Sequence, residues 1–495
     1  MHSTLLSSTI CGIIILIGFF IWKVLRKSCR TTTTTTGTTT NYQYSKMRKR
    51  SWSFSSEGLF IGPMAPEVKC PSAIINCAMF FEEECPSKNE VTDSIVKPML
   101  EYERLSTVPL PNGMYQQRQN NNMFAPECMV RTITIHGSQK VTMDNLTAHL
   151  DDDLRSSSRN LPWWEFLLVK NEGTGNSAVL LRIEHCLADG LSISSILENL
   201  ITDEDGNPHN TKTTTYSKML QKTSNRNLNP LSYIKELFHI LLLEFSPYDS
   251  PTIFTKPNQT TVYSGMREVL LLPEISLDLC KKLKNTAHCT VNDILLFAIS
   301  EAIIDYCKDQ NCPIIGSDSI CRALVPFGYP RSPSQRRDKK TALGNTWSML
   351  SLPMFFNESN LLQRLQKIHE TTTKVKSSPR GVVQLFLQNT LGPLLPVSKS
   401  QQMVRNILTR HSLVVTNLIG PDKPCKFAGK TIVGVQLLNL NFITQASFLS
   451  YNGRVFGSIV LDTDQIKNSQ KIATFYGRAF SKLSREIFHD KRHDT

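Results

Sequence analysis

The stretch that most constrains the fold of this chain is a predicted strand, turn and helix around one histidine. Residues 178–183 are apolar apart from one arginine, residues 184–190 read Glu-His-Cys-Leu-Ala-Asp-Gly, and residues 191–197 are again rich in Leu and Ile. The pattern predicts a buried strand, a sharp turn and a helix. It places His185 at the mouth of the strand, where a side chain with an ordinary pKa of about 6.5 can act as a general base.

Length and charge limit what this histidine can belong to. The chain has 495 residues, 40% of them hydrophobic, so it can bury a large core in two or more domains. Residues 1–51 hold eight Lys or Arg and no Asp or Glu, which leaves only +5 of the formal net charge of +13 for the rest. We therefore expect no nucleic-acid partner. The basic residues are interpreted as a cluster attracted to anionic lipid headgroups, or as a solvated tail.

The N-terminal segment is predicted to be a membrane anchor. Residues 5–22 are nearly all apolar, and positive charges follow from Lys23. Eighteen helical residues span about 27 Å, close to the roughly 30 Å of a bilayer core. A signal peptide would carry its charge before the apolar run, so retention is favoured over cleavage. We expect a single-pass anchor at 1–30, a threonine-rich tether at 31–51 and a cytosolic remainder, at the endoplasmic reticulum.

The cysteine pattern argues against a metal site or a disulfide framework. The thirteen cysteines are scattered along the chain, without a C-x-x-C pair. They are interpreted as reduced thiols of a cytosolic domain. The glycosylation sequons at Asn145, Asn258 and Asn357 would then be chance matches.

The folded part is predicted to have two halves. Residues 52–201 form the first half, 202–230 lose their apolar periodicity and are predicted to be a linker, and 231–495 form the second half. A helix is expected at 233–245. Its apolar arc is too wide for an ordinary surface helix, and a buried core helix is favoured over an interfacial or substrate-tunnel helix.

A second strongly apolar helix is predicted at 290–304, with Thr290 as its N-cap. Asn292 and Asp293 fall in its first turn. Asp293 can complement the helix dipole there, and that use is favoured over a position facing a cleft.

Several short blocks carry a resemblance to a known family. Residues 184–190 resemble the H-H-x-x-x-D-G motif of the bacterial-type wax ester synthase/diacylglycerol acyltransferase family. The further blocks follow in the family's order: Pro-Trp-Trp-Glu at 162–165, Val-Asn-Asp-Ile at 291–294, Leu-Val-Pro at 324–326, Gly-Asn at 344–345, Thr-Asn-Leu-Ile-Gly-Pro at 416–421 and Leu-Ser-Tyr-Asn-Gly-Arg at 449–454. The resemblance covers residues 72–483.

This resemblance implies an α/β fold of two chloramphenicol acetyltransferase-like halves, with the active site in a tunnel at their interface. It implies transfer of a long acyl chain from acyl-CoA to a fatty alcohol or diacylglycerol, without a metal or prosthetic group. The implied site residues lie in the matching blocks: catalytic His185, Asp189, Gly190 and Asn292, and substrate-binding Asp293, Trp164, Gly344 and Asn345.

Elementary chemistry agrees with these roles. An alcohol is a poor nucleophile near neutral pH, so attack on a thioester needs a base such as His185. The thioester is already activated, so no covalent intermediate is needed, and the chain has no G-x-S-x-G elbow. Asp189 is expected to anchor the turn, paired with an arginine, and Gly190 to permit its backbone angles. The side-chain amide of Asn292 is a candidate oxyanion donor.

One departure from the motif leaves alternatives open. Glu184 replaces the family's first histidine; its side chain should point away from His185, although a close carboxylate would raise the pKa of the base. A catalytically silent lipid-surface or scaffold relative therefore remains an alternative, as does another acyltransferase of the same fold. The oligomeric state and the preferred acceptor are left open.

A run of basic residues between two of the family blocks has two interpretations. The run could bind the phosphates of CoA, or it could be a solvated charged loop. The solvated loop is the favoured interpretation. Its members are Arg331, Arg336, Arg337, Lys339 and Lys340.

Overall fold

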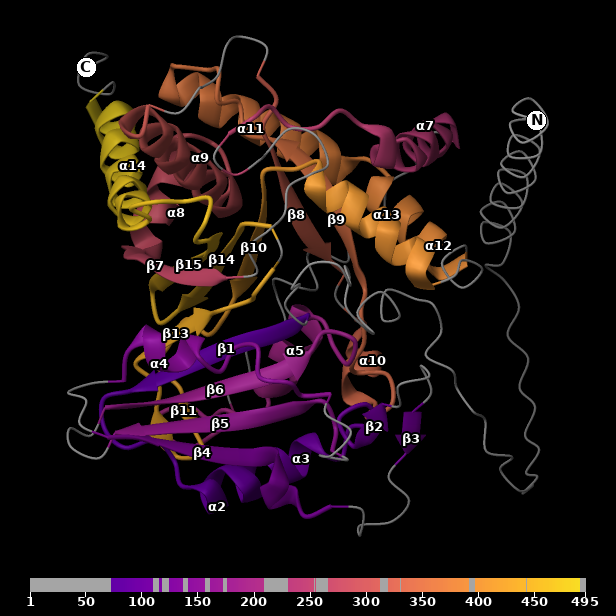
Figure 1. Ribbon diagram of the computed structural model, residues 1–495, viewed down its shortest axis with the longest axis vertical. Coiled ribbons are helices and arrows are strands. Elements are labelled where there is room, and N and C mark those ends of the chain that lie inside the picture. Colours follow the sequence, from indigo (N-terminus) through magenta and orange to yellow (C-terminus); the bar gives the residue numbers. More distant parts are fainter. Residues whose placement is uncertain are drawn as a thin grey trace.

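The structure, a computed structural model, is built on two β-sheets, one in each half, with helices packed against them (Figure 1). It describes residues 73–489 except for 110–114, 118–123, 137–140, 156–160, 172–175, 209–229, 253, 255–265, 312–318, 330, 391–396 and 442. The predicted anchor and tether, and most of the predicted linker, lie outside these residues. In the described part, no single helix is long and apolar enough to cross a membrane. A bent pair, Leu277–Thr286 and Val291–Asp309, meets that test by length and composition only.

The first sheet has five strands in the order β13, β1, β6, β5, β4. Its central strand β6 is buried at every residue, which explains the unbroken apolar run in the sequence. Strands β5 and β6 form the hairpin that the sequence predicts before His185. The elements of this half are β1 (Ile74–Phe81), α2 (Lys88–Val91), η2 (Thr92–Val96), α3 (Lys97–Met99), β2 (Thr107–Pro109), β3 (Tyr115–Gln117), η3 (Pro126–Met129), β4 (Val130–Ile135), α4 (Met143–Thr147), β5 (Trp164–Asn171), β6 (Ser177–Glu184) and α5 (Gly190–Leu197).

The second sheet has six strands in the order β7, β15, β14, β10, β8, β9. Strand β10 pairs in parallel with both β14 and β8, and the other pairs are antiparallel. The elements of this half are α7 (Pro230–Leu241), η4 (Leu243–Phe245), β7 (Arg267–Ser276), α8 (Leu277–Thr286), α9 (Val291–Asp309), β8 (Arg322–Gly328), α10 (Pro333–Arg337), β9 (Trp347–Pro353), α11 (Leu361–Ser377), α12 (Arg380–Thr390), α13 (Val397–Thr409), β10 (Leu413–Ile419), β11 (Lys426–Phe427), β12 (Lys430–Thr431), β13 (Gly434–Leu437), β14 (Gln445–Tyr451), β15 (Arg454–Asp462) and α14 (Gln470–His489).

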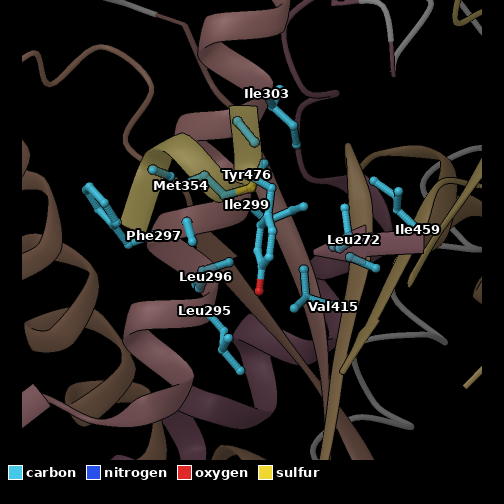
Figure 2. Close-up of a cluster of buried hydrophobic side chains, with 14 of the residues drawn as sticks. Leu272, Leu295, Leu296, Phe297, Ile299, Ile303, Met354, Val415, Ile459 and Tyr476 are labelled. Carbon is cyan, nitrogen blue, oxygen red and sulfur yellow. The ribbon is translucent and has the colours of Figure 1, made fainter. Parts of the chain in front are cut away.

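Helix α9 is the central helix of the second half. Thr290 caps it as predicted: its hydroxyl accepts from the backbone N–H of Asp293, whose carboxylate accepts from the backbone N–H of Thr290. Fourteen of its nineteen residues are buried, so it is a core helix. Figure 2 shows its apolar side chains together with Leu272 of β7, Val415 of β10, Ile459 of β15 and Tyr476 of α14.

The two halves are joined by more than the linker. Strand β13, from the second half of the sequence, pairs antiparallel with β1 at the edge of the first sheet (Figure 1). Cys425, Phe427 and Ile432 also pack into the core of the first half. The predicted division at residues 202–230 is therefore incomplete, because residues 425–437 complete the first half. A sequence pattern cannot show this, since the pairing joins strands more than 350 residues apart.

Helix α7 is not the buried core helix that its composition favours. It packs one face on α12, through Leu237 against Val383, and leaves a second apolar face exposed. Figure 1 shows it at the periphery of the second half, and it packs on α12. The apolar residues of this helix thus form two faces, one packed on α12 and one exposed to solvent.

Candidate active site

The turn that carries His185 is fixed by backbone bonds to the first sheet. Strand β6 ends at Glu184, and the backbone N–H of His185 donates to the carbonyl of Ala73 at 2.8 Å. The N–H of Leu187 donates to the carbonyl of Glu184 at 2.9 Å and closes the turn. Helix α5 begins at Gly190. His185 is therefore held at the end of the sheet, where the sequence places it.

A loop from the second half, residues 344–347, wraps around this turn. The side-chain amide of Asn345 donates to the carbonyl of His185 at 2.7 Å, and its oxygen accepts from the indole N–H of Trp347 at 3.3 Å. The Trp347 ring meets the imidazole edge-to-face, with the centroids 6.1 Å apart. The Gly-Asn block, predicted to bind substrate, thus positions the histidine from the opposite half.

Asp189 lies where the predicted anchoring role needs it. One carboxylate oxygen accepts from the backbone N–H of Ser192 at 2.8 Å and caps α5; the other accepts from the backbone N–H of Thr346 at 2.8 Å. The nearest guanidinium nitrogen of Arg331 is 3.9 Å away, which supplies the expected arginine. Both oxygens accept from backbone groups and the side chain is buried, so its contacts hold the turn, the start of α5 and residue 346 in place.

The predicted reason for glycine at position 190 is wrong. Gly190 is not among the residues with positive φ, so the turn does not require its backbone freedom. A Cβ there would approach a methyl group of Leu418 to 3.1 Å, so close packing against β10 favours glycine instead. Gly344 is the position that needs backbone freedom, with φ of +143°. Its carbonyl accepts from the backbone N–H of Asp189 at 3.0 Å.

Glu184, which replaces the motif's first histidine, is held by two hydrogen bonds from an arginine. Arg155 donates to its two carboxylate oxygens at 2.8 and 2.7 Å, and the guanidinium lies over the ring of Trp163. The side chain is fully buried. Burial raises the pKa of Glu184, while the guanidinium opposes that rise. The carboxylate is thus committed to Arg155.

Burial also governs the protonation of His185. Removal from water lowers the pKa of its imidazole below the ordinary value, and the carboxylate of Asp189 and the amide of Asn345 oppose this only in part. Glu184 is not among the groups that act on it. The upward shift considered from the sequence does not occur, and the imidazole is neutral, and so able to accept a proton, at neutral pH.

Asn292 lies at the interface between the halves. Its side-chain oxygen accepts from the amide of Asn417 at 2.6 Å, and the neighbouring Leu418 packs beside Gly190. The end of β10 thus lies between the start of α9 and the start of α5. The oxyanion role of Asn292 stays a prediction.

Two predicted substrate-binding residues are interior structural residues. The Asp293 carboxylate is fully buried and accepts hydrogen bonds from Thr290, His369 and Thr372. Trp164 is also fully buried, and its indole N–H donates to the carbonyl of Leu105 at 2.8 Å. Motif position alone cannot separate such residues from ones that line a site, because their polar atoms find partners far away in the sequence.

Comparisons with known proteins agree with the motif blocks. Residues 343–484 match the WS/DGAT C-terminal domain. A Mycobacterium bovis protein named as a diacylglycerol O-acyltransferase is 24% identical over 345 residues, covering 65% of this chain and 74% of its own. A wax ester synthase/diacylglycerol acyltransferase of Arabidopsis thaliana is 23% identical over 360 residues, covering 63% of this chain and 72% of its own. The chain is related to the wax ester synthase/diacylglycerol acyltransferases. The predicted relationship and enzyme class, an acyltransferase, are confirmed.

Solved structures show the same α/β fold. The wax ester synthase/diacylglycerol acyltransferase of Marinobacter aquaeolei VT8 superposes with a TM-score of 0.56 at 14% identity, covering 87% of this chain and 98% of its own. A trichothecene 15-O-acetyltransferase of Fusarium sporotrichioides has the same TM-score at 9% identity, covering 87% and 94%. At these identities the likeness concerns the fold alone.

The sequence missed the residues that hold the turn from a distance. Thr346 and Trp347 directly follow the Gly-Asn block, so extending that block by two residues would have included them. Arg155 has no signal of its own, because its partner Glu184 departs from the motif. In the described part of the chain, no cluster of three or more His, Cys, Asp or Glu could hold a metal ion.

The predicted basic cluster is dispersed. Arg331 turns inward toward Asp189, while Lys339 pairs with Glu101 at 3.1 Å and lies over the ring of Tyr102. A small pocket with about 20 Å³ of free space lies beside α5; it is lined by Leu191, Ser192, Ser195, Tyr329, Arg331, Arg336 and Ala342. A role of these arginines at CoA phosphates stays a prediction.

Proposed function

We propose that this chain is an acyl-CoA-dependent O-acyltransferase that transfers a long-chain acyl group to a fatty alcohol or to diacylglycerol, with His185 as the general base. The observation that carries the proposal is the held, neutral imidazole. The backbone of His185 is held by Asn345 from the second half and by Ala73 from the first, the Trp347 ring packs against the imidazole, and burial keeps the imidazole unprotonated near neutral pH.

The proposed reaction is direct transfer. The imidazole of His185 takes the proton of the acceptor hydroxyl as the alkoxide oxygen attacks the thioester carbonyl carbon. The tetrahedral intermediate collapses, the C–S bond breaks, and the CoA thiolate leaves and takes the proton back. No covalent acyl-enzyme, metal or prosthetic group takes part in this proposal. Asn292 is proposed as a donor to the developing oxyanion.

The test is ester formation by the full-length protein in membranes supplied with labelled acyl-CoA and both acceptors together. His185→Ala should lower the rate by about 10²- to 10⁴-fold, the usual contribution of a general base. His136→Ala, at an exposed histidine, is the matched control and should keep wild-type activity. Equal product with and without His185 would contradict the mechanism. That result would favour the alternative of a catalytically silent lipid-surface protein, which the replacement of the motif histidine by Glu184 left open.

The proposed site of action is the cytosolic face of a membrane, the endoplasmic reticulum, with residues 5–22 as the anchor. The apolar run and the basic residues after it support this placement. Protease treatment of sealed microsomes should digest the part after residue 30. Protection of that part would place it in the lumen and contradict the proposal.

A further inference from the structure

Helix α7 and the turn after it carry an exposed apolar stripe. Leu231, Phe238, Leu242 and Phe245 are 69, 45, 60 and 73% exposed. Leu231 and Phe238, seven residues apart, lie within about 20° of each other on one face of α7; Leu242 directly follows the helix, and Phe245 is the last residue of the 3-10 helix η4. Single exposed apolar residues are common on protein surfaces, but a row of large ones on one helix face marks an interaction site.

The stripe is distinct from the face of α7 that packs on α12. Leu237 points to α12, where it meets Val383 with Phe386 and Leu387 nearby. Glu236 is held by Arg380 at 2.7 Å, so the orientation of the helix is fixed by an ion pair as well as by packing. Lys235 is exposed next to the stripe. The four stripe residues therefore face outward because the opposite face is fixed.

Basic residues lie on the elements around the stripe. Helix α13, which packs on η4, carries Lys399 and Arg405 and no Asp or Glu, and Lys235 lies on α7; Arg380 of α12 is paired with Glu236, and Glu244 is the acidic residue of η4. An apolar face flanked by positive charge is the pattern of a helix that lies in the interface of an anionic bilayer. A second copy of this chain would bring the same basic residues together, which disfavours self-association.

We propose that the α7 stripe, Leu231, Phe238, Leu242 and Phe245, lies in the headgroup region of an anionic phospholipid bilayer and sets the orientation of the folded part on the membrane. The apolar run at residues 5–22 would bring the chain to a bilayer, and the stripe would decide which face it presents. The inference does not depend on the proposed acyl transfer, because it rests on exposure and charge alone.

The test maps lipid contact on the full-length protein in vesicles of phosphatidylcholine and phosphatidylserine that contain a photoactivatable phospholipid. After irradiation, labelled peptides are identified by mass spectrometry. Residues 231–245 should be labelled and α14 should not. The variant F238E/L242E/F245E should lower labelling of this segment by about tenfold, the equivalent of 1.4 kcal/mol, and vesicles without phosphatidylserine should lower it as well.

Phe488→Glu is the matched control, since Phe488 is an exposed aromatic residue on α14, and it should leave labelling of α7 unchanged. Turnover of a soluble short-chain acyl-CoA and a short alcohol by the triple variant should equal wild type, which shows that the fold is intact and separates docking from chemistry. Labelling of 231–245 no higher than that of α14 would overturn the proposal. A change from dimer to monomer in the triple variant would assign the stripe to a second copy and overturn it equally.

Discussion

At the scale of the residue, burial of the His185 imidazole decides the pH range over which it can accept a proton. Its pKa lies below the ordinary 6.5, so the neutral form persists into more acidic solution. As the solution is made more acidic, kcat/KM should therefore decrease with an apparent pKa below 6.5. A pH–rate profile of the full-length protein with saturating acyl-CoA measures it. A limb at or above 6.5 would mean that a group other than His185 supplies the base.

The carboxylate of Asp189 should act through geometry. Asp189→Ala removes the cap of α5 and leaves the partly buried N–H of Thr346 without its acceptor, at a cost of about 2 to 3 kcal/mol. Asp189→Asn keeps one acceptor oxygen and should cost less. Urea unfolding measures the stability of each variant, and ester synthesis measures its activity. Asp205→Ala, at an exposed aspartate, is the control. Full stability with lost activity in Asp189→Ala would point instead to a role in proton transfer.

Glu184 and Arg155 form a pair whose two members depend on each other. Removing the guanidinium takes the ion-pair partner from a buried carboxylate, so Arg155→Ala should destabilise the protein by about 3 to 5 kcal/mol near pH 7. The double variant Arg155→Ala/Glu184→Gln removes the charge as well and should recover much of that loss. Chemical unfolding of both single variants and the double variant measures the coupling. Additive losses would show that the two side chains act independently.

At the scale of the element, Asp293 ties the start of α9 to α11. Burial raises its pKa, but hydrogen bonds from Thr372, His369 and Thr290 outweigh burial and lower it. Because the folded pKa is lowered, the carboxylate stabilises the fold above its unfolded pKa of about 3.9, and this contribution is lost as the pH falls below that value.

Asp293→Asn should therefore lose about 1 to 3 kcal/mol at pH 7, because one amide oxygen cannot replace the acceptors of a carboxylate. The difference from wild type should shrink below pH 4. The KM values of both substrates, measured on folded protein, should not change. A raised KM at unchanged stability would restore the predicted substrate-binding role.

Local patterns predicted the elements that carry the site, and long-range contacts decided the rest. The strand, turn and helix around His185 and the Thr290 cap lie where the sequence places them, because each depends on neighbours within a few residues. The partners of Trp164 and Glu184 lie 59 and 29 residues away. Such pairings, like the direction in which α7 turns its apolar faces, depend on tertiary packing and leave no periodic signal.

At the scale of the whole molecule, the two halves share both a sheet and a site. Strand β13 completes the first sheet at β1, and the loop at 344–347 completes the turn around His185. A chain that ends before the second half would expose the edge of β1 and the apolar residues that Phe427 covers. The first half should therefore not reach the native state alone.

Expression of residues 1–229 alone should give aggregated protein, and co-expression with 230–495 should restore a soluble complex that synthesises ester. The break falls between the two sheets and leaves every described strand intact, so the two pieces can still pair β1 with β13. Size-exclusion chromatography of detergent extracts and an acyl-transfer assay follow the outcome, with the uncut chain as control. If residues 1–229 were monomeric alone, with native near-ultraviolet circular dichroism, β13 would not be required for the first half to fold. The active site would then be assembled by docking of two independent domains.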